Sequence, residues 1–281
     1  MTVLVFGASS QIGHFLLPRL LASGESVLAV SRKQQASRSE LNWLVGQLPD
    51  GLPQMPVVSA VLCCGPLQAL ADWLERTQLE NSPRIVALSS MSAEARRDSC
   101  VPAERETSRQ LHAGEAALAR ACDQRSYAWT VLRPTLIYGA GLDRSLTPMA
   151  RRAMRTRIFP LAAGHGLRQP VHADDLAQAM LAALECPAAA GRVLAIGGGE
   201  RLPALVMFAR VRGSLPRGSM PVPLPRWLLR CAGALLPRWR GPLSRLQVDQ
   251  VADNSEVQRL LGIQPRAFRP DAETWRVTPS L

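Results

Sequence analysis

The stretch Thr2-Val-Leu-Val-Phe-Gly-Ala-Ser-Ser-Gln-Ile-Gly13 decides the fold of this chain. Its first five residues are mostly β-branched or apolar, which is typical of a buried parallel strand. Two glycines six positions apart follow, and residues 15–22 then repeat apolar side chains at helical spacing before Ser23-Gly24, a helix-ending signal. Residues 26–30 predict the next strand. A strand, a glycine turn, a helix and a strand within 30 residues predict a βαβ unit.

The same alternation continues through the first half of the chain. It predicts strands at 41–45, 57–63, 84–88 and 128–133, and helices at 66–78 and 102–123. Parallel strands that alternate with helices indicate an α/β fold with a doubly wound parallel sheet, the Rossmann fold. Residues 48–56 break the rule, because three prolines and a glycine in nine positions will not form a crossover helix.

The pattern loosens after residue 133. Helices are expected at 148–157, 173–185, 203–212 and 225–236, with one strand at 193–197. We therefore expect a Rossmann domain over 1–140 and a smaller C-terminal lobe over 141–281. Part of that lobe, around 170–198, is expected to return to the sheet.

The turn between Gly7 and Gly13 predicts a site for a dinucleotide. Such a turn presents backbone N–H groups and the positive end of the helix dipole to a pyrophosphate. Ser10 stands where a third glycine is expected. A tight turn without a ligand is the alternative interpretation.

The second strand ends in Ser31-Arg32-Lys33, and no acidic residue occurs in the next six positions. An acid there would bind the ribose hydroxyls of NAD, whereas an arginine can pair with the 2′-phosphate of NADP. The sequence thus favours NADP, although Lys33 is equally explained as a solvated surface residue.

Composition narrows the chemistry further. The 281 residues carry a formal net charge of +11, Lys33 is the only lysine, and Tyr127 and Tyr138 are the only tyrosines. The six cysteines show no metal-ligand spacing, so we expect no metal site and read them as reduced thiols of a cytoplasmic protein. No nucleic-acid motif and no apolar run long enough for a membrane span are present.

Further motifs follow in order, and together they resemble one family. They are Leu62-Cys-Cys-Gly-Pro66, Leu88-Ser-Ser-Met-Ser92, Leu132-Arg-Pro-Thr-Leu-Ile-Tyr-Gly139, Pro170-Val-His-Ala-Asp-Asp-Leu-Ala177 and the glycine-bounded stretch 191–198. With the turn at 7–13 they resemble the extended and atypical short-chain dehydrogenase/reductases, the NAD-dependent epimerase/dehydratase family, over residues 1 to about 213. The resemblance implies a cofactor that lies along Gly7, Ser9, Ser10, Gln11, Ile12, Gly13, Arg32, Lys33, Cys64, Gly65, Leu88 and Pro134.

The family's catalytic pair, Tyr-x-x-x-Lys, is missing. Its motif aligns on Thr107, where the tyrosine is expected, and Leu111, where the lysine is expected. A threonine hydroxyl is a far poorer acid than a phenol, and leucine carries no charge. No shift of register repairs this, because the only lysine and both tyrosines lie elsewhere.

Ser89, Ser90 and Tyr138 are the substitutes that the sequence offers. The serines follow the fifth strand and could hold a substrate oxygen, or only cap the strand end. Tyr138 could act as an acid, or only pack. His112 and His172 are weaker alternatives, as are the adjacent Cys63 and Cys64; a solvated helix face, a loop contact and buried thiols are the favoured interpretations of these residues.

Arginines concentrate in the second half. Residues 144–168 hold six arginines and residues 201–248 hold nine, and neither segment contains an acid. A cleft lined by arginines would suit an anionic small molecule such as a diphosphate, and scattered solvated charges are the alternative. Residues 226–240 combine an apolar stretch with two tryptophans and four arginines, which suits peripheral membrane contact or a core helix.

Two functions remain open from the sequence. The first is an NADP-binding enzyme of the epimerase-like or reductase-like type with a non-standard catalytic set, acting on an anionic small molecule. The second is a non-catalytic NADP-bound structural or redox-sensing protein, which resembles the accessory subunit of respiratory complex I in the same superfamily. The substrate and the oligomeric state are not readable from the residues.

Overall fold

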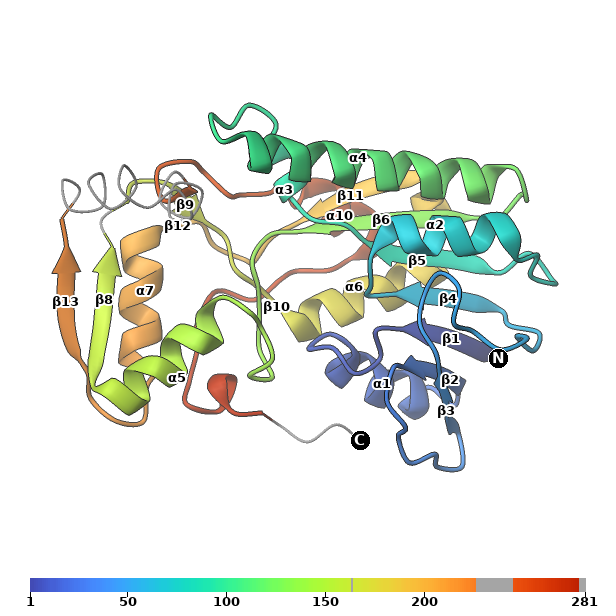
Figure 1. Ribbon diagram of the computed structural model, residues 1–281, viewed down its shortest axis with the longest axis horizontal. Coiled ribbons are helices and arrows are strands. Elements are labelled where there is room, and N and C mark those ends of the chain that lie inside the picture. Colours follow the sequence, from blue (N-terminus) through green and yellow to red (C-terminus); the bar gives the residue numbers. More distant parts are fainter. Residues whose placement is uncertain (163, 226–244, 278–281) are drawn as a thin grey trace.

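A seven-stranded parallel sheet forms the centre of the molecule (Figure 1). The computed structural model describes residues 1–162, 164–225 and 245–277. The strands follow the order β11-β6-β5-β4-β1-β2-β3 across the sheet. Their bounds are β1 Thr2–Phe6, β2 Ser26–Ser31, β3 Leu41–Val45, β4 Ala60–Cys63, β5 Arg84–Leu88, β6 Trp129–Pro134 and β11 Arg192–Ile196. From β1 the chain continues to β2 and β3 on one side and then returns to β4 on the other side of β1. Sheets of this kind bind ligands where the strand order reverses, here at the carboxyl ends of β1, β2 and β4. We call this edge of the sheet the ligand edge.

Helices cover both faces of this sheet. On one face, α1 (Gly13–Ala22), α6 (Ala173–Glu185) and α10 (Ser255–Leu261) bury apolar side chains against the strands. On the other face, α2 (Leu67–Arg76) and α4 (Pro102–Asp123) do the same. The alternating inward and outward residues of β1 explain this, since Val3 and Val5 enter the first cluster and Leu4 and Phe6 enter the second. A short helix, α3 (Ser92–Ala95), follows β5.

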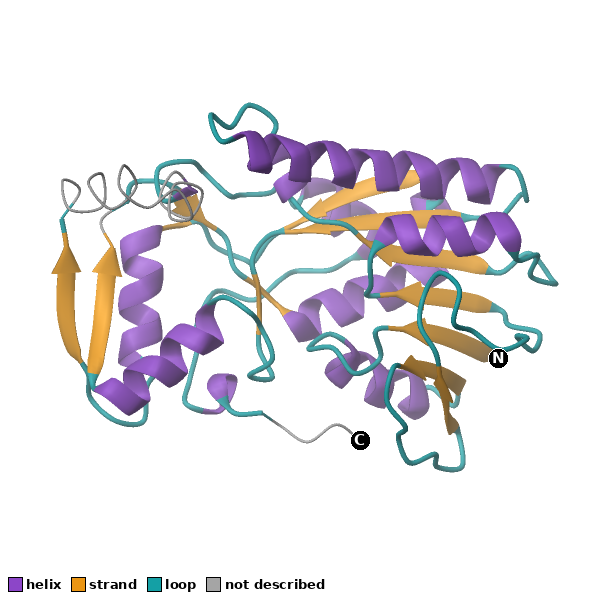
Figure 2. Cartoon of the chain, in the orientation of Figure 1, coloured by secondary structure: helices purple, strands orange, loops and turns teal. Residues whose placement is uncertain are grey.

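A smaller lobe lies beyond the carboxyl ends of the strands (Figure 2). It contains α5 (Leu146–Thr156), α7 (Ala204–Gly213) and a parallel pair formed by β8 (Ile158–Ala162) and β13 (Met220–Leu224). Short pairs join it to the sheet: β7 (Ile137–Tyr138) with β10 (Val171–His172), and β9 (Leu167–Arg168) with β12 (Leu202–Pro203). Its core includes Phe159, Phe268 and Trp275, so the segment after α10 passes back between the lobes and ends in the short helix η2 (Glu273–Trp275).

The sequence predicted most of this architecture. The α/β class, the doubly wound parallel sheet and the smaller lobe are confirmed, and residues 52–58 run as an irregular connection to β4, with no helix anywhere between β3 and β4. β11 joins the main sheet beside β6, and the one-turn helix η1 (Pro187–Ala189) precedes it. The small two-stranded sheets of the lobe were missed. The helix expected at 225–236 and the interfacial segment expected at 226–240 lie almost entirely outside the described residues. No helix in the described part of the chain is long and apolar enough to cross a membrane.

The contact between Gly13 and β1's turn generates a prediction on stability. A Cβ atom on Gly13 would lie 1.9 Å from the carbonyl oxygen of Ala8, a distance that no backbone tolerates. Gly13→Ala is therefore expected to lower the free energy of unfolding by about 1–3 kcal/mol or more, as overpacking does. Gly213→Ala is the control, because its Cβ would meet nothing within 4 Å. Urea unfolding measures both, and equal stabilities would contradict the packing role.

Candidate functional site

The glycine turn leaves backbone donors free at the start of α1. The N–H of Ser10 donates to the carbonyl of Gly7 at 2.9 Å, and the N–H of Gly13 donates to Ser10 Oγ at 3.2 Å. Within the described residues, the N–H groups of Gln11 and Ile12 have no acceptor. Two free donors at a helix N-terminus form a site for an anion, and here that site lies at the carboxyl end of β1.

Two further observations test whether a dinucleotide fits here. The buried Gln11 Oε1 atom has no hydrogen-bond partner, which is the state expected of a polar group that a ligand satisfies. Gly7 has φ +73° and approaches Cys64, where a Cβ would lie 3.1 Å from the cysteine Cβ. Ser10, which stands where a third glycine is expected, uses its hydroxyl to accept the N–H of Gly13 at the start of the helix. The residues present therefore fit a pyrophosphate.

Cations at the end of β2 extend this site. Arg32 and Lys33 are exposed, and neither forms an ion pair with any described residue. The Lys33 N–H donates to the hydroxyl of buried Ser31 at 3.2 Å, which fixes the direction of the chain as it leaves the strand. Two unpaired cations beside the glycine turn can hold a phosphate on a ribose.

The structure gathers the predicted cofactor residues along one edge of the sheet. All of them lie at or directly after the carboxyl end of a strand: Gly7, Ser9, Ser10, Gln11, Ile12 and Gly13 after β1, Arg32 and Lys33 after β2, Cys64 and Gly65 after β4, Leu88 in β5 and Pro134 in β6. Ser89 and Ser90 follow Leu88 on the same edge. Thr107 and Leu111 lie apart from the strand ends, on α4.

An ion-pair network holds the Ser89 side chain. Its hydroxyl donates to Glu115 Oε1, and Arg133 donates to both oxygens of the same carboxylate, from Nε to Oε1 at 2.7 Å. Arg133 also donates to Glu94 Oε1 at 2.7 Å. Side chains of Arg133 and Glu115 are 17% and 6% exposed, so the pair is largely buried. The hydrogen bonds to Glu115 raise the pKa of Arg133 against the opposing effect of burial.

Ser90 keeps a proton that it can donate. Its Oγ accepts the N–H of Ser92 at 3.1 Å, and in the described structure the hydroxyl hydrogen has no acceptor. Thr107, by contrast, donates its hydroxyl to the carbonyl of Ala103 at 2.9 Å on its own helix. Thr107 therefore does not replace the missing tyrosine, and Leu111 is a partly exposed apolar residue.

His112 belongs to the outer side of this network. Its Nδ1 lies 3.3 Å from Arg133 Nη2, and its Nε2 lies 3.4 Å from Arg97 Nη2. Both contacts are with guanidinium groups, next to a surface pocket lined by Arg97, Arg105, Ser108 and Arg109. His112 thus lies between Arg133 of β6 and Arg97, which follows α3, with the carboxylates of Glu94 and Glu115 at 3.7 and 3.6 Å. This position supports its interpretation as a helix-face residue.

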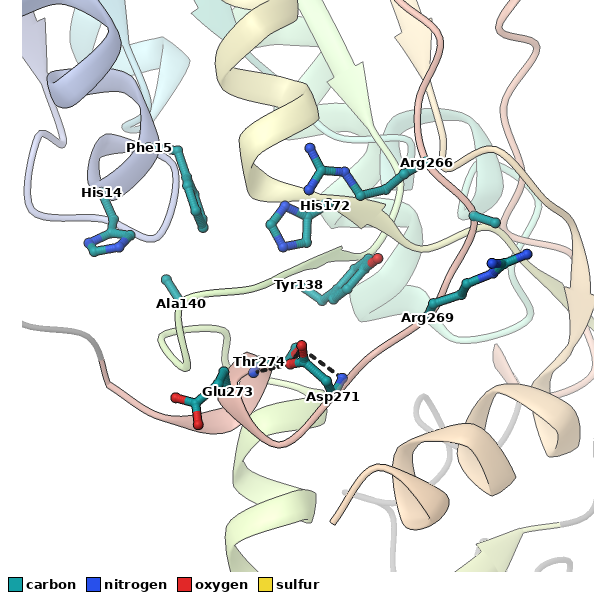
Figure 3. Close-up of a pocket in the computed structure, with 11 residues that line it drawn as sticks. His14, Phe15, Tyr138, Ala140, His172, Arg266, Arg269, Asp271, Glu273 and Thr274 are labelled. Atoms are coloured by element: carbon teal, nitrogen blue, oxygen red, sulfur yellow. Dashed lines mark hydrogen bonds between the residues drawn. The ribbon is translucent and has the colours of Figure 1, made fainter. Parts of the chain in front are cut away.

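A pocket of about 650 Å³ lies beside the first turn of α1 (Figure 3). Its walls come from α1, the loop after β7, the N-terminus of α6 and the segment that returns after α10. The lining residues are His14, Phe15, Tyr138, Ala140, His172, Arg266, Ala267, Arg269, Asp271, Glu273 and Thr274. Residues 266–274 were missed by the sequence analysis, because they follow α10 without a recognisable motif.

Tyr138 is buried in the wall of this pocket, at 2% exposure. Burial raises the pKa of Tyr138 to about 12, and a hydrogen bond from the backbone of Arg269 to the phenol oxygen opposes this rise. Its ring contacts His172 and Phe268, with ring centroids 5.0 and 4.8 Å away. The packing interpretation of Tyr138 thus has direct support, and a phenol with this pKa stays protonated near neutral pH.

His172 presents one nitrogen to the pocket. Its Nδ1 accepts the N–H of Asp174 at 3.1 Å, which caps α6 and leaves the proton of the neutral ring on Nε2. In Figure 3 the ring lies between Phe15 and Tyr138. Burial, together with the charge of Arg266, lowers the pKa of His172, so the ring is neutral at pH 7. His172 can therefore donate one hydrogen bond to a ligand.

The cysteines and possible metal ligands add no chemistry. Burial raises the pKa of the Cys63 thiol to about 12 and raises that of Cys64 further, which disfavours both thiolates. In the described part of the chain, no group of three or more His, Cys, Asp or Glu side chains could hold a metal ion.

Comparison with known families agrees with this geometry. Residues 67–197 match the model of the NAD dependent epimerase/dehydratase family. The resemblance predicted from the sequence is thereby confirmed, although the match begins after the glycine turn. No curated protein sequence matches the chain.

Solved structures share the fold, and two of the following three are named as epimerases. MoeE5 in complex with UDP-glucuronic acid and NAD has a TM-score of 0.72 at 19% identity, and the alignment covers 99% of this chain and 98% of that one. UDP-glucuronic acid 4-epimerase from Bacillus cereus, in complex with UDP-glucuronic acid and NAD, gives 0.68 at 16% identity over 95% of both chains. UDP-glucose 4-epimerase from Thermotoga maritima gives 0.68 at 15% identity, covering 99% and 97%.

The Glu115 network predicts a large loss of stability. Glu115→Gln removes the charge that pairs with largely buried Arg133, and breaking such a pair costs about 3–5 kcal/mol. Glu106→Gln on the same helix is the control, because its pair with Arg109 is exposed and contributes at most about 1 kcal/mol. Chemical unfolding measures both variants. Similar losses in the two would show that the network is not a structural element.

His172 predicts a pH dependence of stability. Its pKa is lowered in the folded state, so the unfolded chain takes up a proton first as the pH falls below about 6.5. This residue should therefore destabilise the fold progressively between pH 7 and pH 5. His172→Asn keeps an acceptor for the helix cap but does not titrate. The variant should lose less stability than the wild type over this range, as measured by thermal melts; parallel profiles would refute it.

Proposed function

We propose that this protein binds a nicotinamide dinucleotide and acts on an anionic small molecule in an epimerase-like or reductase-like reaction. The observation that carries the proposal is the glycine turn, with the free N–H groups of Gln11 and Ile12 and the unsatisfied Gln11 side chain. The match of residues 67–197 to the epimerase/dehydratase family model and the similarity to solved structures such as UDP-glucuronic acid 4-epimerase support the hypothesis that the protein is an enzyme. Because those neighbours are named with UDP-sugars, nucleotide sugars are the first substrate class to test.

The cofactor's nicotinamide supplies hydride transfer when bound. The chain's own residues have other tasks. Gln11 and Ile12 hold the pyrophosphate, and Arg32 and Lys33 bind the adenosine end. Ser90 has an uncommitted hydroxyl at the end of β5 and can donate to a substrate oxygen. The catalytic set is non-standard, because the hydroxyls of Ser89 and Thr107 donate to other groups of the protein and burial keeps Tyr138 protonated.

A non-catalytic role is the second candidate, and the same engaged hydroxyls favour it. On this hypothesis the protein holds a dinucleotide without turning it over. Purified protein incubated with oxidised cofactor and UDP-glucose or UDP-glucuronic acid separates the two hypotheses. The enzyme hypothesis expects an epimerised or oxidised sugar by NMR, and bound, unchanged cofactor and sugar would support the alternative.

Preference for NADP is part of the proposal and rests on Arg32 and Lys33. The solved neighbours are named with NAD, so the choice is tested directly. NADPH is expected to bind more tightly than NADH in a fluorescence titration, and Arg32→Ala should weaken NADPH binding about tenfold while NADH binding stays within twofold. Equal affinities of the wild type for the two cofactors would remove the role given to Arg32.

Ser90 and Tyr138 give opposite expectations for turnover. Ser90→Ala should lower kcat about 100-fold with an unchanged dissociation constant for the cofactor, because it removes a hydroxyl donor. Tyr138→Phe should stay within a few-fold of the wild type, because the hydroxyl is buried in the pocket wall and its pKa is raised to about 12. Initial rates with the substrate found above measure both. A large effect of Tyr138→Phe would return this residue to the catalytic set.

Peripheral membrane contact through 226–240 is a separate proposal on residues outside the described structure. It rests on the two tryptophans and four arginines of that segment. Flotation with anionic liposomes at low salt tests it, and protein that stays at the bottom of the gradient excludes it.

A further inference from the structure

The pocket beside α1 has a wall of four aromatic rings in contact with one another (Figure 3). The ring of Phe15 contacts those of His14 and His172, with ring centroids 4.9 and 5.2 Å apart. His172 also contacts Tyr138 at 5.0 Å, and Tyr138 packs on Phe268, which belongs to the core of the smaller lobe. The cavity of about 650 Å³ is large enough for a small molecule, and a ring of that molecule can pack against this wall.

Two nitrogen atoms of the wall are left for a ligand. His14 Nδ1 is buried and has no hydrogen-bond partner in the described structure. His172 accepts the N–H of Asp174 at Nδ1, and its Nε2 proton has no described acceptor. Both imidazoles contact the Phe15 ring, so a molecule that packs on this ring lies near both of them. An unpartnered buried polar atom is costly, and a polar ligand removes that cost.

Four charged side chains complete the lining, and two of them already have partners. Arg266 Nη2 lies 2.7 Å from a carboxylate oxygen of Asp174 and 2.7 Å from one of Asp175. Glu273 Oε1 lies 2.6 Å from Arg276 Nη1. These two side chains are neutralised within the protein, so they add little net charge to the pocket.

The other two charged side chains, Arg269 and Asp271, form no ion pair with any described residue. Asp271 Oδ1 accepts the N–H of Thr274 at 2.9 Å and its hydroxyl at 2.8 Å, which holds the carboxylate in place. These hydrogen bonds lower the pKa of Asp271, so the carboxylate is charged at neutral pH. In Figure 3 both residues lie on the chain segment that passes Tyr138. The described lining of the pocket therefore offers one unpaired cation and one unpaired anion.

We propose that this pocket binds an aromatic amino acid in its zwitterionic form. Arg269 binds the carboxylate, Asp271 binds the ammonium group, and the rings of the wall hold the aromatic side chain. A ligand with only a negative charge is repelled by Asp271, and one with only a positive charge is repelled by Arg269. The pocket begins one residue after Gly13, and neither Gln11 nor Ile12 lines it. The amino-acid site therefore does not rest on the proposed function.

Isothermal titration of the whole protein with L-phenylalanine tests the proposal. Phenethylamine lacks the carboxylate and 3-phenylpropionate lacks the ammonium group, but both keep the ring. Each should bind at least about tenfold more weakly than phenylalanine, because each loses one charge-assisted contact. Absence of phenylalanine binding at millimolar concentration overturns the proposal, and so does equally tight binding of either analogue.

Arg269→Gln and Asp271→Asn should each weaken phenylalanine binding about tenfold or more. Asparagine keeps an acceptor for the N–H of Thr274, so the local turn is retained. Arg120→Gln and Asp98→Asn are the matched controls, because both residues are exposed and form no ion pair with any described residue. Arg120 lies on α4, on the opposite face of the sheet from α1. Wild-type affinity in the two pocket variants, or an equal loss in the controls, contradicts the assignment.

NMR of the wild type replaces the variants if they do not fold. His14 and His172 are two of only four histidines in the chain, so their ring Hε1 signals can be resolved. Nuclear Overhauser effects from the phenylalanine ring to these two signals are expected, and their absence overturns the proposal.

Competition separates this pocket from the dinucleotide site. Phenylalanine should keep its affinity within about twofold when NADPH is saturating. Displacement by NADPH would show that the pocket is part of the dinucleotide site and would overturn the proposal. Phenylalanine binding by a protein that binds neither NADPH nor NADH would leave this pocket standing while the proposed function fails.

Discussion

One buried carboxylate, that of Glu115, fixes the ligand edge of this molecule. It accepts from Ser89 at the end of β5 and from Arg133 in β6, and Arg133 reaches Glu94 in α3. A buried charge is tolerated only when it is paired and hydrogen-bonded, so these contacts must form together. Two strands and two helices are thereby locked at the place where a substrate would meet a cofactor. Within this network the Ser89 hydroxyl donates to Glu115, so it is unavailable as a donor to a ligand.

The central sheet could be predicted because its signals are local. Each strand is a short apolar run, and most connections in the first half carry a helix, while the connection between β3 and β4 is a proline-rich loop. The lobe gave weaker signals. β8 and β13 pair although they lie about 60 residues apart. Their three prolines, Pro160, Pro221 and Pro223, have no backbone N–H to donate to a neighbouring strand. Prolines are tolerated on such an edge pair, yet they argue against a strand when only the sequence is read.

In the candidate site, too, some features could be predicted from the sequence and others could not. Positions at strand ends follow from topology, which is why residues from Gly7 to Pro134 meet along one edge. The direction of a hydroxyl does not follow from topology. Ser89 and Ser90 are neighbours with the same motif, but only Ser89 lies within reach of Glu115 on a helix 26 residues away.

The arginine excess has a structural meaning in part. Arg168, Arg245 and Arg266 hold the lobe to the sheet through backbone carbonyls and through Glu104, Asp174 and Asp175, so these cations are used for assembly. Arg32 and Lys33 are among the cations with which no described carboxylate forms an ion pair, and both directly follow the carboxyl end of β2.

The two tyrosines complete the constraint on the chemistry. Tyr127 is buried, with its hydroxyl accepting the N–H of Leu79 at 2.8 Å and donating to the Leu79 carbonyl at 2.9 Å. Tyr138 is buried, and its pKa is raised to about 12. Burial therefore keeps the Tyr138 phenol protonated, the Tyr127 hydroxyl is engaged with backbone, and the one lysine follows β2. No described tyrosine has a lysine beside it to lower its pKa, so the chemistry of the family's Tyr-x-x-x-Lys pair is not available to this site.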